Sequence, residues 1–572
     1  MNPDEASSTK PAPRRGRARH FLALALAVVL GAAVAPLALP DHDGVTRALA
    51  RERSNLPVWA IRKLAGANVD PAQAVVSLSS SRGGIPLPRS YLGISTEYWT
   101  LPYYVAHMDT LERVLAQVHV PGDGPLILRI GGDSADHSFW DLPARKAEPW
   151  MFRVTPDWLK QIRTIVNRGG VRLILDLNLV TDSRGAAIRW ARAAYNGLPR
   201  GAITGLEIGN EPDLYNRWYW LSMLAEGFGN GLLPAQISAL TYTHDFRVYA
   251  RALARAAPGL PLIGPALSNP VLNIGWFKSL ITHQRSRLLM VSAHQYPFSR
   301  CVPRHSRAYP SIGRILSERA SAGIGHRLAP VIRLAHRAGL PLRLTELNSV
   351  TCGGVPGISN TFATALWAPD ALFELLHAGV DGVNVHVREH PINGAYAFDT
   401  GGLVARPLLY GMILFARTLG QDAHLLPVHL QNEPSLGLKV WAVRVRGGML
   451  HILLIDKGHR PVRVLLALPA RAPATVERLL APSVAARGSV VLAGQWLGRQ
   501  GQWLGRRSVQ TIARGRRGYV VTVPTGSAAL VRVRLGAPPR AHRVQRQPAQ
   551  HSPRSRSRWT RAGGHDRRPT HR

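Results

Sequence analysis

The sequence predicts an α/β protein, a (β/α)8 TIM barrel followed by an all-β sandwich domain. Between residues 89 and 420, eight short apolar runs typical of strands alternate with amphipathic segments typical of helices. No glycine-rich phosphate turn follows an early strand, so the rival fold, an open doubly wound sheet, is disfavoured. After Gly420 the helical periodicity stops, and short strand-like runs separated by turns follow.

The predicted barrel strands are the apolar runs Tyr91–Thr96, Leu126–Ile130, Val171–Leu177, Ile203–Ile208, Pro261–Pro265, Leu289–Ala293, Leu342–Thr345 and Gly382–His386. One helix between them has clear boundary residues. Thr155 is a suitable N-cap, Pro156 suits the first helical position, and Gly169-Gly170 ends the segment. Apolar spacing predicts further helices over Asp245–Ala257 and Thr361–His377.

The predicted sandwich domain covers residues 421–536. Its strands are expected at Val440–Val445, Leu450–Ile455, Val462–Leu468, Val490–Leu492, Tyr519–Val523 and Ala528–Leu535. Within it, the run Gly494–Arg499 is repeated as Gly501–Arg506, and two copies indicate a duplicated loop tip and not a solenoid. Residues 41–88, before the barrel, are expected to be a lead-in segment with a short helix.

The first 40 residues have the pattern of an export signal. Four arginines between residues 14 and 19 precede an uncharged, mostly apolar run from Phe21 to Leu39. The length of this run lies between that of a signal peptide and that of a short membrane span, so a cleaved signal and a membrane anchor both stay open. We therefore expect an exported protein, secreted or anchored to the cell envelope. Residues 537–572 are rich in Pro and Arg and are expected to be a disordered tail.

The chain is strongly basic, with 71 Lys and Arg against 34 Asp and Glu, a formal net charge of +37. An excess of this size is typical of proteins that meet nucleic acids, anionic surfaces or anionic substrates. The basic residues are mostly Arg, are spread along the whole chain, and accompany no DNA- or RNA-reading motif, so specific nucleic-acid binding is disfavoured. An anionic glycan or envelope and a plain compositional bias toward Arg both stay open.

Two predicted barrel strands run into a glutamate. The fourth is followed by Gly209-Asn210-Glu211-Pro212-Asp213, and the seventh by Glu346. Charge at the exit of a buried strand is costly unless it is used or paired. Strand ends of a barrel meet at one face, where active sites form. Since the fourth and seventh strands lie across this face from each other, the pattern predicts two carboxylates across one cleft. The alternative is two ordinary glutamates, each bound to a neighbouring Arg.

Paired carboxylates at such a site are typical of glycosidic bond cleavage, and a separation of about 5–5.5 Å gives the retaining mechanism. In that mechanism Glu211 would act as general acid and then as base. Glu346 would attack the anomeric carbon and form a glycosyl ester. Asn210, beside the acid, is placed to hydrogen-bond the sugar 2-hydroxyl.

Over residues 89 to 535 the sequence resembles glycoside hydrolase family 79, the β-glucuronidase and heparanase group. The run from Gly209 to Asp213 matches the acid/base motif of that family, and Thr345–Ser349, followed by Gly353-Gly354, matches its nucleophile segment. Gly382–His386 matches its eighth strand. The resemblance implies a catalytic barrel, a β-sandwich built mainly from the C-terminal part, a glycan or glycoside substrate, and no cofactor.

The resemblance also implies a set of residues that line the sugar subsite: Glu97, Asp133, Ser134, Tyr296, Tyr396, Gly353 and Gly354. Among them, Glu97 matches an acid that contacts sugar hydroxyls, and Tyr396 matches a tyrosine that helps to hold a uronic acid carboxylate. The N–H groups of Gly353 and Gly354 are expected to face the same carboxylate. For every member except Glu97, plain packing is an equally good interpretation.

One position departs from the family pattern. Five residues after Glu346, where the family has a tyrosine that binds the carboxylate, this chain has Thr351 and then Cys352. Cys301 and Cys352 are the only cysteines, and an even pair in an exported chain favours a disulfide over two buried thiols. That bond would tie the loop after strand six to the loop after strand seven. The replacement of the tyrosine by Thr351 affects which sugar is expected to be recognised, but it leaves the expected hydrolase chemistry intact.

We therefore expect a retaining β-glycosidase of the β-glucuronidase type. Two alternatives stay open: a retaining glycosidase with another sugar specificity, such as a β-xylosidase, and a catalytically silent carbohydrate-binding protein of the cell envelope. The sequence has no His-Glu-x-x-His, no Cys pair with metal spacing and no P-loop, so no metal or cofactor is expected. His294 and His386, at strand ends, are expected to orient active-site groups.

Overall fold

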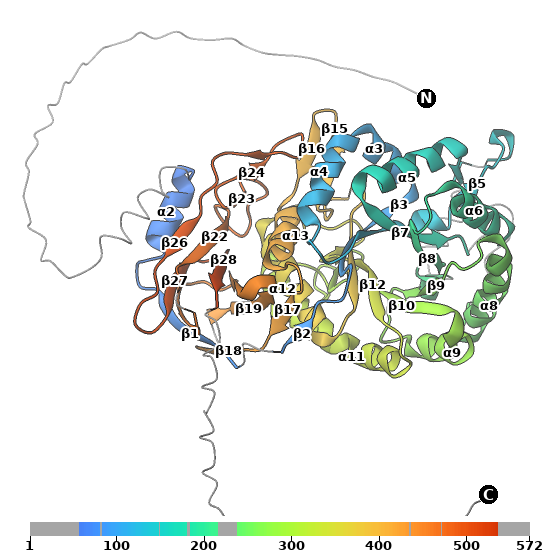
Figure 1. The fold of residues 1–572 in the computed structure, drawn as a ribbon. Helices are drawn as coiled ribbons and strands as arrows, with labels where there is room; N and C mark the ends of the chain where they lie inside the picture. Colours follow the sequence, from blue (N-terminus) through green and yellow to red (C-terminus); the bar gives the residue numbers. More distant parts are fainter. Residues whose placement is uncertain are drawn as a thin grey trace, which may run out of the picture. The chain divides into compact units, whose positions relative to one another are not determined.

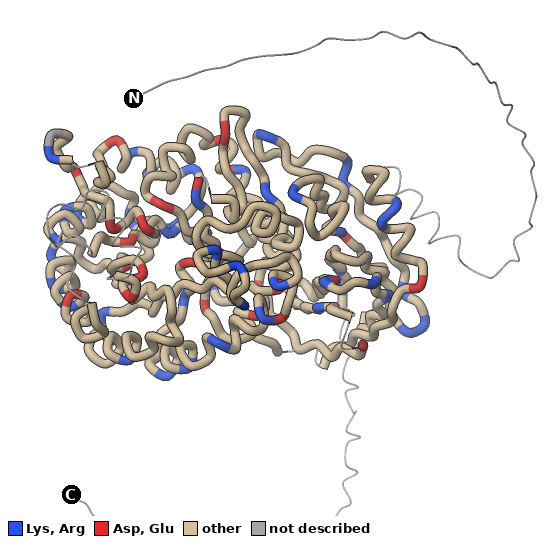
Figure 2. The backbone as a smooth tube through the Cα atoms, turned by 180° about the vertical axis from the view of Figure 1, so that it is seen from behind, with Lys and Arg blue, Asp and Glu red and all other residues tan. Residues whose placement is uncertain are grey.

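The computed structural model describes residues 56–79, 83–147, 149–179, 184–215, 237–389, 391–433, 436–470 and 472–535. The predicted export segment and the Arg-rich tail lie outside these residues. Within the described ranges, no helix is both long enough and apolar enough to cross a bilayer. Lys and Arg occur over the barrel and the β-sandwich alike, as Figure 2 shows, and no single helix concentrates them.

Eight parallel strands close into a barrel, which confirms the predicted fold class (Figure 1). In chain order they are β3 (Leu92–Glu97), β4 (Leu126–Gly131), β7 (Val171–Leu177), β8 (Ile203–Ile208), β9 (Leu262–Leu267), β10 (Leu288–Gln295), β12 (Leu342–Leu347) and β14 (Gly382–His386). The ring closes where β14 pairs with β3. Each predicted run is found as a barrel strand, and the sixth extends past Ala293 to Gln295.

Helices follow the strands around the outside of the barrel: α3 (Leu101–Ala106), α4 (Met108–Val118), α5 (Pro156–Gly169), α6 (Arg184–Gly197), α8 (Ala239–Ala256), α9 (Ile274–Gln284), α10 (Ile312–Leu316), α11 (Ala322–Arg337), α12 (Phe362–Ala378) and α13 (Pro407–Thr418). The boundaries of α5 follow from its sequence. The Thr155 hydroxyl accepts the Trp158 N–H, Pro156 occupies the first helical position, and Gly170 ends the helix in the left-handed conformation. Two short parallel pairs, β5 (Ser138–Trp140) with β6 (Phe152–Val154) and β11 (Phe298–Ser299) with β13 (Val350–Thr351), decorate the loops.

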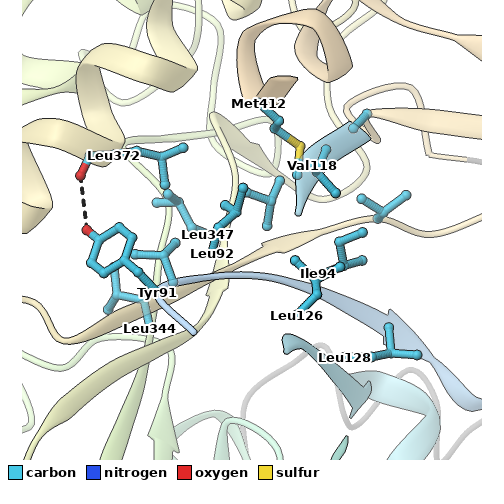
Figure 3. Close-up of a cluster of buried hydrophobic side chains, with 14 of the residues drawn as sticks. Tyr91, Leu92, Ile94, Val118, Leu126, Leu128, Leu344, Leu347, Leu372 and Met412 are labelled. Carbon is cyan, nitrogen blue, oxygen red and sulfur yellow. Dashed lines mark hydrogen bonds between the residues drawn. The ribbon is translucent and has the colours of Figure 1, made fainter. Parts of the chain in front are cut away.

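Helices α12 and α13 are buried over almost their whole circumference, unlike α5, which exposes one face. Their sequences are apolar on all sides, as expected of a helix with neighbours on both faces. One neighbour is the barrel: Figure 3 shows the Tyr91 hydroxyl donating to the Leu372 carbonyl of α12, with Leu344 and Leu347 beside it and Met412 of α13 nearby. The other neighbour is the β domain.

The β domain is a sandwich of two sheets that share one apolar cluster. The smaller sheet has the order β18 (Val428–Asn432), β1 (Ala72–Leu78), β21 (Val462–Ala467), β27 (Tyr519–Val523). The larger has the order β2 (Ile85–Pro86), β17 (His424–Leu426), β19 (Leu438–Val445), β20 (Met449–Asp456), β28 (Ser527–Arg534), β22 (Ala474–Leu480), β23 (Val491–Leu492), with β26 (Gln510–Ile512) on β22. Helix α2 (Val58–Gly66) and the hairpins β15 (Tyr396–Asp399)–β16 (Gly402–Ala405) and β24 (Trp496–Leu497)–β25 (Trp503–Leu504) complete the elements.

The larger sheet is buried on both faces. Along β20, Leu450, Ile452 and Leu454 belong to the cluster between the two sheets, whereas Leu453 and Ile455 belong to the cluster that continues into the barrel. A polar contact crosses the same boundary, because the Trp441 Nε1–H donates to the Asp370 carboxylate of α12 at 3.0 Å. Barrel and sandwich therefore share a continuous core.

Six sandwich strands lie outside the predicted set. β1 comes from the segment expected to be a mere lead-in, and it lies between β18 and β21 in the smaller sheet. β2, β17, β18, β22 and β26 were likewise missed. β1 is rich in Ala and β18 has only two apolar residues, so neither run has the strong β-branched pattern of the strands that were found. The repeated run behaves more simply: its two copies supply β24 and β25, which pair as one antiparallel hairpin.

Candidate active site

The carboxyl ends of six barrel strands surround a cavity of about 780 Å³. It is lined by Asp133, Asn210, Glu211, Leu214, Ser268, Asn269, Tyr296, Pro297, Phe298, Ser299, Cys301, Val302, Ala308, Glu346, Thr351, Cys352, Gly353, His386, Arg388 and Asn393. Both predicted glutamates are on this wall, together with Asn210 and Tyr296. The barrel thus brings together residues that lie far apart in the sequence.

Glu211 stands on a strained turn after β8. Its φ of 47° is left-handed, which costs energy for a residue other than glycine and is typical of functional positions. The preceding Gly209 also has positive φ, and Pro212 opens the short 3-10 turn that follows. The turn directs the carboxyl group into the cavity, where its Oε1 lies 2.9 Å from His294 Nδ1.

Glu346 lies on β12 and is held by donors on both of its oxygens. The Arg129 guanidinium donates to Oε1 at 2.6 Å, and the Tyr296 hydroxyl donates to Oε2 at 2.7 Å. His386 Nδ1 lies 2.9 Å from the same Oε2. A carboxylate bound in this way keeps its negative charge and a fixed orientation, as a nucleophile requires.

Glu211 and Glu346 face each other across His294. One carboxylate oxygen of each and one His294 nitrogen all lie within 4.8 Å of one another. This spacing is that of retaining glycosidases, whose carboxyl groups are about 5–5.5 Å apart, and is shorter than the roughly 6.5–9.5 Å that an inverting enzyme needs for its water.

The surroundings of the two carboxyl groups push their pKa values apart. Burial raises the pKa of Glu211 to about 7, and the contact with His294 only partly opposes this. Burial would also raise the pKa of Glu346, but His294, His386 and the Arg129 guanidinium together hold it well below its usual value. Below about pH 7 Glu211 is therefore mostly a carboxylic acid while Glu346 is a carboxylate, the division of roles that acid–nucleophile catalysis needs.

This division predicts a bell-shaped dependence of kcat/KM on pH. Activity should fall above about pH 7, as Glu211 loses its proton, and on the acidic side only well below pH 4.5, as Glu346 gains one. Initial rates with a nitrophenyl glycoside between pH 3 and 9 measure both limbs. Glu211→Ala should remove the basic limb with an activated leaving group. A rate that stays flat from pH 6 to 9 in the wild type would contradict these roles.

Arg129 lies beneath the two glutamates and binds several of the site's acidic and polar groups, a role that was not predicted for it. Its guanidinium is fully buried and donates to Glu207 at 2.6 Å, Asp176 at 2.8 Å and Asn210 Oδ1 at 3.0 Å, in addition to Glu346. The sequence held one indication: Arg129, Asp176 and Glu207 are each a charge inside a predicted barrel strand that is mostly apolar. Charged side chains buried in such positions are stable only when they pair with opposite charges.

The structure places Glu97 differently from the expectation. Its carboxylate is fully buried and does not line the cavity; Oε2 accepts both the N–H and the hydroxyl of Ser134, at 2.9 and 2.6 Å. On the cavity side it is covered by cationic groups, because Arg388 Nε lies 3.4 Å and His386 Nε2 3.5 Å from Oε1. Ser134 thus positions Glu97 and is not on the wall, whereas Asp133 is.

Two further residues that were expected to bind a carboxylate, Tyr396 and Gly354, do not line the cavity. Tyr396 is buried against Tyr104, to whose hydroxyl it donates at 3.2 Å, and it does not line the cavity. The Gly354 N–H is used in a turn, donating to the Thr351 carbonyl at 3.2 Å. Gly353 lies on the wall as expected. The loops on which these residues lie are folded by their own local contacts, which the spacing of residues in the sequence does not reveal.

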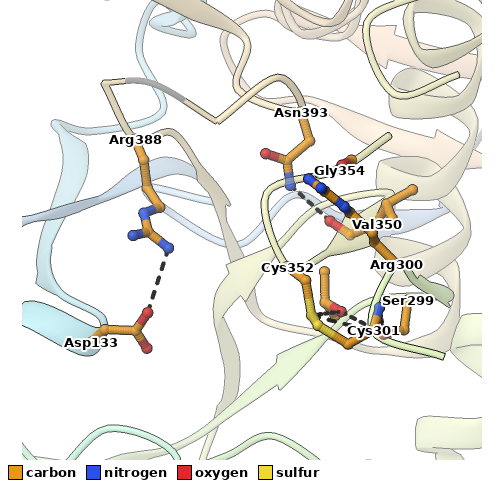
Figure 4. Close-up of a disulfide and its surroundings, with 10 residues drawn as sticks. Asp133, Ser299, Arg300, Cys301, Val350, Cys352, Gly354, Arg388 and Asn393 are labelled. Atoms are coloured by element: carbon orange, nitrogen blue, oxygen red, sulfur yellow. Dashed lines mark hydrogen bonds and ion pairs between the residues drawn. A yellow bond between two sulfur atoms is a disulfide. The ribbon is translucent and has the colours of Figure 1, made fainter. Parts of the chain in front are cut away.

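The predicted disulfide is confirmed. Cys301 and Cys352 are bonded, with Cα atoms 6.2 Å apart, and both line the cavity. They join the loop after β10 to the loop after β12, beside the β11–β13 pair. Figure 4 shows the bond on one wall, with Asn393 above it and the Arg388–Asp133 pair on the opposite side.

Reduction of this bond should destabilise the protein and loosen the cavity. The chain-entropy estimate for a loop of 51 residues is about 4 kcal/mol, so the Cys301→Ser, Cys352→Ser double variant should lose about 2–4 kcal/mol of unfolding free energy. Urea unfolding with and without a thiol reductant measures this. The double variant is the control, since reductant should no longer shift its midpoint; an unshifted midpoint in the wild type would contradict the prediction.

Glu211, His294 and Glu346 each contribute one atom to this cluster, and the three atoms are spaced closely enough to be metal ligands. However, the 2.9 Å between His294 Nδ1 and Glu211 Oε1 is a hydrogen-bond distance, and the Arg129 guanidinium lies against Glu346. The donors and acceptors already present account for the arrangement without an ion.

Comparison with known proteins agrees with this fold. No family model matches the chain. A β-glucuronidase of Aspergillus niger is 24% identical over 428 residues, covering 64% of this chain and 72% of the relative. Among solved structures, a 4-O-α-L-rhamnosyl-β-D-glucuronidase from Fusarium oxysporum has a TM-score of 0.62 at 17% identity, covering 80% of this chain and 99% of that one. The GH51 arabinofuranosidase from Xanthomonas axonopodis pv. citri has a TM-score of 0.59 at 15% identity, covering 81% and 100%. The chain therefore has a glycoside-hydrolase-like fold.

Proposed function

We propose that this protein is a retaining β-glycosidase of the β-glucuronidase type, related to glycoside hydrolase family 79. The observation that carries the proposal is the pair Glu211 and Glu346, whose oxygens lie within 4.8 Å of each other and whose pKa values are shifted in opposite directions. The similarity to a fungal β-glucuronidase supports it. The disulfide supports the further proposal that the protein works in an oxidising compartment outside the cytosol.

In the proposed reaction, Glu346 attacks the anomeric carbon while Glu211 gives its proton to the departing oxygen. The products of this step are a glycosyl–Glu346 ester and the free aglycone. Glu211, now a carboxylate, then takes a proton from water as the water attacks the ester, which restores both groups. Arg129 binds the amide oxygen of Asn210, so that Asn210 presents its NH2 group to the sugar 2-hydroxyl.

One specific observation favours a second candidate, a retaining glycosidase for a neutral sugar such as xylose. Thr351 occupies the position of the expected carboxylate-binding tyrosine, and neither Tyr396 nor Gly354 lines the cavity. A panel of nitrophenyl β-glucuronide, β-glucoside, β-xyloside and α-L-arabinofuranoside separates these candidates. The first-formed anomer is observed by proton NMR and should keep the configuration of the substrate. An inverted anomeric configuration in the first-formed product would overturn the mechanism. If none of the glycosides were hydrolysed, the remaining interpretation would be a non-catalytic carbohydrate-binding protein.

A further inference from the structure

The cavity has one strongly cationic side chain on its sugar side that the reaction above does not use. Of the described residues that line the cavity, Arg388 is the only Lys or Arg. It follows β14 by two residues, and its side chain is 30% exposed, so it is accessible to a ligand in the cavity. Such a residue requires an explanation, because neutral sugar hydroxyls can be bound without a fixed positive charge.

Arg388 is held in place by two acids that leave it oriented toward the cavity. Its Nε lies 3.4 Å from Glu97 Oε1 and its Nη1 lies 3.4 Å from Asp133 Oδ2. Both distances are longer than the roughly 2.7–2.9 Å of a strong charge-assisted hydrogen bond. The two acids therefore fix the position of the guanidinium electrostatically without the short, paired geometry that an Arg and a carboxylate form at their best.

The same contacts connect Arg388 to the nucleophile. His386 touches Glu346 through Nδ1 at 2.9 Å and Glu97 Oε1 through Nε2 at 3.5 Å, and Arg388 Nε contacts that same Oε1. One imidazole and one carboxylate thus lie between the guanidinium and Glu346. Because Glu346, His386 and Arg388 line one cavity, a sugar whose C1 faces Glu346 has Arg388 on the same wall as His386.

The charge arrangement reverses what the sequence suggested. Glu97 was expected to meet sugar hydroxyls as an acceptor, yet Arg388 and His386 cover it, so a ligand meets the donors of these two cations there, with the Asp133 carboxylate beside Arg388. Burial would lower the pKa of His386, but the Glu346 carboxylate outweighs this and raises it to about 9, so the imidazole is also charged at neutral pH. A wall of this kind suits an acidic sugar.

We propose that Arg388 is the anchor of an anionic-sugar subsite and binds the C5 carboxylate of a uronic acid in place of the missing tyrosine. This inference rests on the proposed function and specifies its substrate class. It also resolves the conflict raised by Thr351, because recognition moves from the loop after β12 to the loop after β14 on the other side of the cavity (Figure 4). The site takes hexuronides and discriminates against the corresponding hexosides.

The test compares two substrates that differ only at C6, nitrophenyl β-D-glucuronide and nitrophenyl β-D-glucoside. Arg388→Gln should lower the ratio of their kcat/KM values by about 10- to 100-fold, the factor expected for a hydrogen bond to a charged group, and Arg388→Lys should lower it less. Arg300→Gln is the matched control. Arg300 lies beside the disulfide, donates to the Gly354 carbonyl and does not line the cavity, so its loss should leave the ratio unchanged.

A second readout is independent of turnover. D-glucuronate should bind the wild type more tightly than D-glucose in calorimetric titrations, and Arg388→Gln should remove this difference. If the variant slowed both substrates equally and kept the preference for glucuronate, Arg388 would act only by positioning Glu97 and the proposal would be wrong. A wild type that turned over the glucoside as well as the glucuronide would overturn the subsite but not the glycosidase. No turnover of either substrate, together with no binding of either sugar, would overturn both.

Discussion

Glu346→Gln is expected to lower kcat for the best nitrophenyl glycoside by at least about 10⁴-fold, the scale seen when an enzyme loses its nucleophile. The amide has nearly the same shape but cannot form the glycosyl ester. Arg129 and Tyr296 donate to different oxygens of Glu346, and because an amide NH2 group accepts no hydrogen bond, one of the two donors loses its acceptor in the variant. The measurement is the steady-state rate, with circular dichroism to establish that the variant is folded.

Azide distinguishes the two carboxyl groups in this experiment. In Glu346→Ala, azide can occupy the space of the missing group and attack the anomeric carbon of a β-glycoside, which gives an α-glycosyl azide. In Glu211→Ala, azide should instead attack the glycosyl ester and give the β-azide. Glu112→Gln, on the outside of α4, is the control and should retain full activity. If the two variants gave the same azide anomer, the roles assigned here would be wrong.

Arg129→Met should be the most damaging single change to stability. Three carboxylates, those of Asp176, Glu207 and Glu346, would remain buried without their shared cation, and breaking a buried ion pair in this way costs about 3–5 kcal/mol. Chemical unfolding at pH 7 measures the loss. Arg343→Met is a useful comparison, since that buried Arg donates to the Asn384 amide oxygen and to the backbone carbonyls of Ser90 and Tyr91.

The loss in free energy of unfolding caused by Arg129→Met should depend on pH. Without the guanidinium, the pKa of the buried Glu346 should rise in the folded state, toward its value in the unfolded chain, because Arg129 is one of the cations that hold it down. A carboxyl group whose pKa is lowered by folding stabilises the folded state at pH values above its unfolded pKa, and the variant loses part of that contribution. The variant should therefore lie closest to the wild type near pH 4 and furthest from it at pH 7. A deficit that stayed constant over this range would argue against carboxylate desolvation as its cause.

The barrel could be predicted because its evidence is local. Each strand is an apolar run bounded by turn residues, and the glutamates at Glu211 and Glu346 interrupt that pattern where the parallel strands end. The roles of Arg129 and Arg388 could not be predicted in this way. Arg129 becomes intelligible only when Asp176, Glu207 and Glu346 from three other strands surround it, and these contacts depend on which strands are opposite each other in the closed ring.

The residues that face the cavity on the sugar side could not be predicted from the sequence, for a related reason. Glu97 ends a strand, as a sugar-binding acid should, but whether it or Arg388 faces the cavity is decided by the loop after β14. Tyr396 similarly lies on a hairpin that packs its ring against Tyr104 and Phe398. Loop conformations are set by contacts between segments, and such contacts leave no periodic trace in a sequence.

The position of β1 restricts how this protein can be shortened or rearranged. Residues 72–78 form an interior strand of the smaller sheet, paired with β18 on one side and β21 on the other. Deleting them would leave the facing edges of β18 and β21 unpaired and prone to aggregation, and would also open the shared core. A recombinant barrel trimmed on both sides would lose the cover over α12 and α13 and should be recovered as insoluble protein. Circular permutants that join the two ends of the described chain near β1 and β28, and open a surface loop elsewhere, are the safer route to a smaller or re-ordered version.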